Sequence, residues 1–256
     1  ERYFMRDGVA TVDALVSLTG FSLVGGPAYN DAAAAEKVLA ALDGPYIAAQ
    51  PVEFQTLDQW QQSERGLLPI EATMMVAIPE LDGATGSMVF GGRPSGVNGG
   101  PRSMQAHSER ADMLSRRVEK LVLLRRAERA KRKVAIVLFN FPPNGGATGT
   151  AAYLSVYASL FNTLTGLSRA GYTVELPADI DTLRSRILEG NAARFGAGAN
   201  VHARITADDH VRRERHLAEI EAQWGPAPGR QQSDGSAIQV LGERFGNVFV
   251  GVQPAF

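Results

Sequence analysis

Cysteine is absent from the 256-residue chain. Its absence excludes disulfides, thiolate metal sites and cysteine nucleophiles, and it agrees with a reducing cytosol. No run of about 18 apolar residues occurs, so the sequence predicts no helix that spans a bilayer. The formal net charge is −1, which means that no overall field draws the chain to nucleic acid or to an anionic membrane.

Common catalytic and nucleotide-binding motifs are missing as well. No Gly-Lys-Ser/Thr or G-x-G-x-x-G sequence occurs, which argues against a P-loop and against a dinucleotide fold. None of the four histidines stands at a zinc-ligand spacing, and no Ser-His-Asp arrangement can be read from the spacing. We therefore interpret the histidines as surface or capping residues.

What the chain does contain is typical of a globular α/β protein. Apolar residues make up 45% and charged residues 21%, and the length allows one large domain or two small ones. Composition divides the chain into an α/β segment (1–93), a Gly/Pro-rich loop with a long basic helix (94–132) and a second α/β segment (133–256). The first residue is Glu1 and an apolar run lies almost at the end, so we expect a fragment of a longer protein.

Apolar periodicity and turn residues predict the secondary structure. Helices are expected over residues 11–18, 32–42, 56–63, 108–131, 150–170, 180–192 and 208–224. Strands are expected over residues 46–49, 134–139, 172–175, 237–241 and 247–252. Pro79 should prevent one continuous helix between Leu67 and Gly83. The order of strands and helices in the C-terminal half predicts layers of both, with parallel pairing of strands.

Three carboxylates, Glu71, Glu80 and Asp82, lie in an otherwise apolar stretch. If residues 80–82 are extended, the side chains of Glu80 and Asp82 point to the same side. Carboxylates in apolar surroundings often act as bases, and oxygen ligands suit Mg²⁺. We predict Glu80 as metal ligand or base, Asp82 as a second metal ligand and Glu71 as support. Ordinary turn and capping roles are the alternative.

Two glycine-containing segments are candidates for ligand binding. Residues 141–150 follow a predicted strand and open a predicted helix, where backbone N–H groups bind anions well. The candidate contacts there are Asn144, Gly145, Thr148 and Thr150, and a purely structural turn is the alternative. Glycines in residues 244–254 allow a flat ligand or another backbone to approach closely, with Gln253 as a further candidate. A buried strand with bulges is the alternative there.

Basic residues are dense between Arg116 and Lys133. Aromatic residues are not interleaved with them, which argues against single-stranded nucleic acid as a partner. A solvated helix face or a docking face for an acidic protein is expected.

Several segments together resemble the large-subunit family of magnesium chelatase and cobaltochelatase. They are Val12–Leu15, Gly20–Pro27, Ile78–Ala84, Val89–Arg93, Val134–Val137, Phe141–Asn144, Gly149–Leu154, Trp224–Pro226 and Gly246–Pro254. The similarity covers essentially the whole chain in the right order, and Phe141–Asn144 with Gly149–Leu154 resembles the magnesium branch. The chain departs from the family at Thr85–Met88, where a family carboxylate is missing.

The resemblance implies a much larger porphyrin-binding subunit that inserts Mg²⁺ into protoporphyrin IX for chlorophyll or bacteriochlorophyll synthesis. It implies two partners, an AAA+ ATPase subunit and its integrin-domain-type companion, which use ATP that this chain does not bind. The expected location is the cytoplasm, or the plastid stroma in a plant-type source. The alternatives are a cobaltochelatase large subunit, a non-catalytic tetrapyrrole-binding module and an unrelated nucleotide-binding domain that uses residues 144–150.

Overall fold

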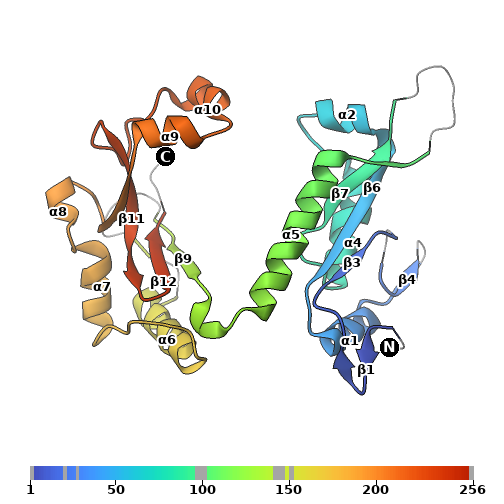
Figure 1. Ribbon diagram of the computed structural model, residues 1–256, viewed down its shortest axis with the longest axis horizontal. Coiled ribbons are helices and arrows are strands. Elements are labelled where there is room, and N and C mark those ends of the chain that lie inside the picture. The colour runs from blue at the N-terminus through green and yellow to red at the C-terminus, as the bar shows by residue number, and fades with distance from the viewer. Residues whose placement is uncertain are drawn as a thin grey trace. The chain divides into compact units, whose positions relative to one another are not determined.

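The computed structural model describes residues 3–19, 22–26, 29–95, 103–140, 148–149 and 153–253. The chain divides into two compact units, Glu1–Arg126 and Ala127–Phe256 (Figure 1). The division falls inside the segment 94–132, so that the long basic helix belongs to the first unit. No helix in the described ranges is long and apolar enough to cross a membrane.

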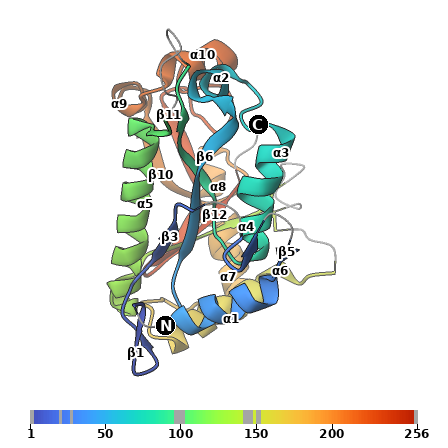
Figure 2. The same cartoon turned by 90° about the vertical axis from the view of Figure 1, so that its right-hand side faces the viewer.

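A four-stranded sheet organises the first unit. Its order is β3 (Leu15–Ser17), β6 (Tyr46–Thr56), β7 (Met88–Arg93) and β8 (Gln105–Ala106). The first three strands run parallel and β8 runs antiparallel to β7. Helix α5 (Ser108–Arg126) lies on one side of the strands, and α3 (Pro69–Ala72) and α4 (Ile78–Leu81) lie on the other (Figure 2).

Short elements complete the first unit. Helix α1 (Ala32–Leu42) is confirmed as predicted, and the Asp31 carboxylate caps it by accepting the Ala34 N–H at 2.9 Å. Helix α2 (Leu57–Gln62) follows β6 directly. Two two-stranded ribbons consist of β1 (Met5–Arg6) with β2 (Val9–Ala10) and of β4 (Gly25–Gly26) with β5 (Tyr29–Asn30).

The predicted helix over residues 11–18 is wrong. Leu15, Val16 and Ser17 form β3, which pairs in parallel with Tyr46, Ile47 and Ala48 of the buried strand β6. Leu15 packs against Tyr46 and Ala48 in a small apolar cluster. Strand pairing at this edge satisfies the backbone groups, and this tertiary interaction overrides the local helical pattern.

The expected helix break at Pro79 is also wrong. Helical structure runs from α3 through a π-helical turn (Thr73–Ala77) into α4. In the π turn the Ile78 N–H donates to the Thr73 carbonyl, five residues back. Pro79 lies at the start of α4, where a proline is tolerated because its missing N–H is not needed. Its ring is buried. Residues 80–82 are therefore not extended.

A second four-stranded sheet organises the second unit. Its order is β10 (Val201–Thr206), β11 (Ala237–Phe245), β12 (Val248–Val252) and β9 (Val134–Leu138). Strands β9 and β12 are parallel, which confirms the predicted parallel pairing in the C-terminal half, whereas the other two pairs are antiparallel.

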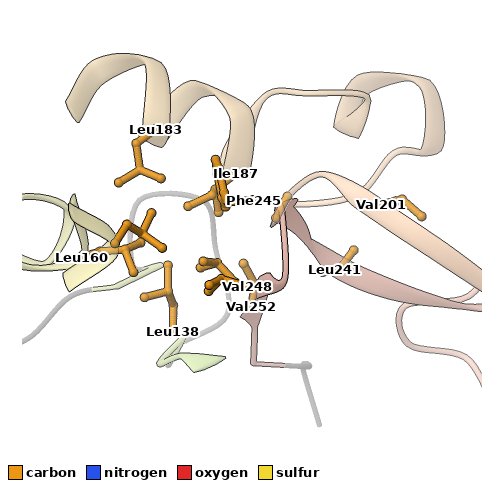
Figure 3. Packing of buried hydrophobic residues seen from close by; sticks show 12 residues of the cluster. Leu138, Leu160, Leu183, Ile187, Val201, Leu241, Phe245, Val248 and Val252 are labelled. Carbon is orange, nitrogen blue, oxygen red and sulfur yellow. The ribbon is translucent and has the colours of Figure 1, made fainter. Parts of the chain in front are cut away.

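Helices α6 (Val156–Arg169) and α7 (Ile180–Leu188) supply apolar side chains to the core of this second sheet. Leu160, Leu183 and Ile187 meet Phe245 and Val248 there (Figure 3). This contact buries one face of the sheet. Burial on this scale is the main favourable term in folding the unit.

Several predicted boundaries in the second unit are wrong. Residues 153–155 precede α6 rather than belonging to it, and residues 172–175 form no strand. The predicted helix 208–224 is two helices, α9 (Ala207–Arg213) and α10 (Leu217–Trp224). Helix α8 (Ala192–Phe195) is separate from α7, and β10 and the 3-10 turn at Arg129–Lys131 were not predicted.

Candidate functional site

Glu71 is completely buried at the first turn of α3. One of its carboxylate oxygens accepts the Leu68 N–H at 3.0 Å and the Gln55 side-chain N–H at 2.5 Å, and the other accepts the Phe54 N–H at 3.2 Å. The carboxylate thereby joins the end of β6 to the start of α3. Because both oxygens are occupied by N–H donors, the geometry supports a structural role for Glu71.

Asp82 ends α4 and is only 1% exposed. Its Oδ2 accepts the Leu23 N–H at 2.6 Å, while Oδ1 is buried without a hydrogen-bond partner among the described residues. Burial raises the pKa of Tyr46, and the nearby Asp82 carboxylate acts in the same direction against a hydrogen bond with Ser17. Asp82 therefore anchors the segment after β3 through one carboxylate oxygen, and its other oxygen accepts no hydrogen bond from the described residues.

Glu80 lies on the exposed surface of α4. No hydrogen bond or ion pair of its side chain is present in the described part of the chain. Glu80 and Asp82 do not share a side of an extended strand, because the segment is helical. Across the described ranges, no three His, Asp or Glu side chains come together as a metal ion requires. The metal and base roles of Glu80 and Asp82 stay predictions.

The second unit brings together two residues that were predicted separately. Asn140, which is 8% exposed, lies two residues after the end of β9. The Thr148 hydroxyl donates to Asn140 Oδ1 at 3.0 Å, and the Asn140 N–H donates to Gln253 Oε1 at 3.4 Å. Thr148 and Gln253 thus meet at one buried residue, Asn140, through its side chain and its backbone respectively. The meeting point is the carboxyl end of the parallel pair β9 and β12, where α/β sheets usually bind ligands.

A cavity of about 320 Å³ opens beside this polar cluster. Asn140 and Gln239, both buried amides, line it, and the exposed Arg230 lies at its wall. Amide groups that both donate and accept, beside one guanidinium, suit a small polar or anionic group. Asn140 was missed in the sequence, although a polar residue directly after an apolar strand was the available signal.

The remaining predicted contacts Asn144, Gly145 and Thr150 lie outside the described residues. Thr148 is described and is 4% exposed, but it does not open a helix, because α6 begins at Val156. The Tyr157 hydroxyl of α6 donates to the Thr148 carbonyl at 3.3 Å. Burial raises the pKa of Tyr157, and the nearby Arg184 opposes this shift.

Comparison with known proteins adds the decisive observation about ancestry. The sequence family described as CobN/Magnesium Chelatase matches residues 1–256. The chain belongs to the CobN/magnesium chelatase family. The magnesium-chelatase H subunit of Cereibacter sphaeroides is 51% identical over 270 residues, which cover 100% of this chain and 23% of that protein. The family resemblance expected from the sequence is confirmed.

More distant relatives come from both branches of the CobN/magnesium chelatase family. The chloroplastic magnesium-chelatase protein ChlH of Oryza sativa is 40% identical, over 97% of this chain and 18% of that protein. The aerobic cobaltochelatase protein CobN of a Sinorhizobium species is 30% identical, over 77% of this chain and 16% of that protein.

A solved structure, the catalytic subunit of cobaltochelatase from Mycobacterium tuberculosis, matches with a TM-score of 0.73 and 25% identity. The match covers 99% of this chain and 22% of that subunit. The chain therefore spans less than a quarter of the relatives that it matches.

Proposed function

We propose that this chain is part of the large, porphyrin-binding subunit of a magnesium chelatase. That subunit inserts Mg²⁺ into protoporphyrin IX during chlorophyll or bacteriochlorophyll synthesis, together with an AAA+ ATPase subunit and its integrin-domain-type companion, which hydrolyse ATP. The observation that carries the proposal is the difference in sequence identity to the two kinds of relative. It is 51% to a magnesium-chelatase H subunit over the whole chain, against 30% to a cobaltochelatase subunit over 77% of it.

Insertion of Mg²⁺ has two physical obstacles. The ion gives up its water ligands reluctantly, and two pyrrole protons must leave the macrocycle. A carboxylate can replace a water ligand and can accept a proton. Among the three predicted carboxylates, Glu80 is exposed on a helix, whereas Glu71 and Asp82 hold backbone N–H groups. Glu80 is therefore the proposed ligand or base, and the other two support the shape of its surroundings.

The polar cluster of the second unit is the proposed contact for polar groups of the substrate. Asn140 is added to the predicted Thr148 and Gln253 because hydrogen bonds join all three. The cavity beside them offers amide groups and Arg230, which suit a small polar group. Asn144, Gly145 and Thr150 keep their predicted binding roles.

The first experiment substitutes Glu80 by Gln in the full-length subunit. Gln keeps the size of the side chain but can neither accept the proton nor neutralise Mg²⁺. We expect porphyrin affinity to remain while steady-state chelation, measured with ATP and both partner subunits, falls about 10²–10⁴-fold. Glu36→Gln, which alters an exposed carboxylate on α1, is the matched control and should chelate normally.

Chelation at the wild-type rate by Glu80→Gln would reject the role of Glu80. An equal loss of porphyrin binding and of rate would mean that Glu80 maintains the fold instead. Either result would leave the family membership untouched, because that rests on the whole sequence.

A cobaltochelatase function is the second candidate, because a cobaltochelatase catalytic subunit matches the fold over 99% of the chain. The two functions differ in the metal and in the tetrapyrrole. Parallel assays with Mg²⁺ and protoporphyrin IX, and with Co²⁺ and a corrin-type substrate, separate them. Activity confined to the second assay would replace the proposed function.

A further inference from the structure

In the described part of the second unit, helices α6 and α7 pack on one face of the sheet and leave the other face uncovered. On β9, Val134, Ile136 and Leu138 point into the core, whereas Val137 is 65% exposed on the opposite face. Phe139, which follows β9, is 54% exposed. We call this opposite side the outer face. Its apolar side chains are unusual for a sheet surface that faces water.

Two glycines give the outer face a flat centre. A Cβ added at Gly242 of β11 or at Gly251 of β12 would stand 2.9 Å from the Phe249 ring. The ring therefore lies directly over the backbone of both glycines. Any larger residue at either position would lift the ring off the strands. Gly251, which lies in the segment singled out in the sequence, and Gly242 thus allow the Phe249 ring to lie flat against the strands.

Basic side chains surround a hollow next to that ring. The hollow has a volume of about 310 Å³, and Lys133, His202 and Arg244 line it together with Phe249. The His202 ring contacts the Phe249 ring, with 5.0 Å between centroids, at the bulge in β10. No Asp or Glu lines the hollow, and the described residues form no ion pair with Lys133 or Arg244.

Arg244 is held in place for an anion. Its Nε donates to the Gly246 carbonyl at 2.6 Å, which restrains the guanidinium on an otherwise exposed side chain. A fixed guanidinium binds a carboxylate with two parallel hydrogen bonds and loses little side-chain entropy in doing so. Lys133 adds a second positive charge at the strand start.

We propose that the outer face binds a flat aromatic dicarboxylate, with the ring system on Phe249 and its apolar neighbours and the carboxylates at Arg244 and Lys133. Charge complementarity carries this choice, because the hollow offers cations without a single acidic neighbour among its described lining residues. Protoporphyrin IX has this chemistry, so the inference rests on the proposed function and assigns its substrate to a particular surface.

The test titrates the full-length subunit with protoporphyrin IX and with its uncharged dimethyl ester, following fluorescence quenching. The double variant Lys133→Gln/Arg244→Gln removes both cations from the hollow. We expect it to bind the acid about tenfold or more weakly than wild type and to bind the ester about equally, because only the acid carries the carboxylates that the two cations would hold. Phe249→Leu should weaken both ligands.

The matched control is Arg184→Gln/Arg215→Gln, which removes two exposed arginines that do not line the hollow. It should bind both porphyrins like wild type. Unchanged acid affinity in the Lys133/Arg244 variant would overturn the inference. If wild type bound neither porphyrin, the proposed function would fail as well.

Discussion

The two units bury different kinds of polar group. Among the described residues, the first unit buries two carboxylates, Glu71 and Asp82, whereas the buried polar side chains of the second unit are all neutral, such as Asn140 and Asn200. The apolar cores differ too. The first unit has small separate clusters around Val52 and around Tyr46, and the second has one large cluster.

The difference shows how each unit holds its connections. In the first unit, carboxylates accept N–H groups from segments distant in sequence, so they join loops that the small clusters do not fix. In the second unit, the large apolar core holds the helices on the sheet. The buried amide side chains there pair with nearby hydrogen-bond donors and acceptors. A site that offers both hydrogen-bond donors and acceptors suits an amide side chain. The surroundings of Glu71 offer only N–H donors, which suit a carboxylate.

The largest loss of folding stability is expected for Asn200→Asp in the second unit. Asn200 Nδ2 donates to the Gly242 carbonyl at 3.0 Å and to Glu243 Oε2 at 2.5 Å. A carboxylate there would oppose Glu243 and leave the carbonyl unpaired. We expect the free energy of unfolding to fall by about 3 kcal/mol. Urea denaturation measures it, with Gln223→Glu at an exposed position of α10 as control.

A somewhat smaller loss is expected for Glu71→Gln in the first unit. The new amide nitrogen would face one of the three N–H donors that Glu71 now satisfies. The free energy of unfolding should fall by about 2 kcal/mol in the same denaturation experiment. Glu64→Gln, on the exposed loop before α3, should change little. If Glu71→Gln and Glu64→Gln had the same free energy of unfolding, the proposed contrast between the two units would be contradicted.

The smallest effect concerns an exposed carboxylate of the second unit. Hydrogen bonds from Ser236, the main cause, and from Ala237 and Arg204 lower the pKa of Asp234 from 3.8 to about 2. A lowered folded-state pKa means that the stabilisation is complete above pH 3.8 and is lost as the pH falls towards about 2. Asp234→Asn should therefore reduce the acid dependence of stability in that window. Identical acid titrations of the melting temperature would refute this.

Much of the local structure was readable from residues alone. Apolar periodicity and turn residues predicted α1, and the apolar run that includes Val134–Leu138 predicted β9. The start of α9 has a local cause as well, because the Thr206 hydroxyl caps it by accepting the Asp209 N–H at 3.1 Å. These features depend on neighbours within a few positions in the chain, so the sequence carries their whole cause.

The candidate site was only partly readable. Thr148 and Gln253 were predicted on separate segments, but nothing in their spacing indicated that Asn140 joins them. Parallel pairing of β9 with β12 brings these segments to one sheet edge. The outer face could not be predicted from the sequence either, because it depends on which side of each strand the helices cover.

By itself, the sequence determined the family, the strongly periodic helices and the apolar strands, since each follows from composition and from short-range order. Only the tertiary structure decided that residues 15–17 are a strand, because the bonding partner is β6. It also decided that Pro79 continues a helix, because a π turn changes the hydrogen-bond register before it. In the first case strand pairing outweighs local preferences of about 1 kcal/mol or less per ordinary residue, and in the second the π turn avoids the cost of about 3 kcal/mol that a proline has inside regular α-helix.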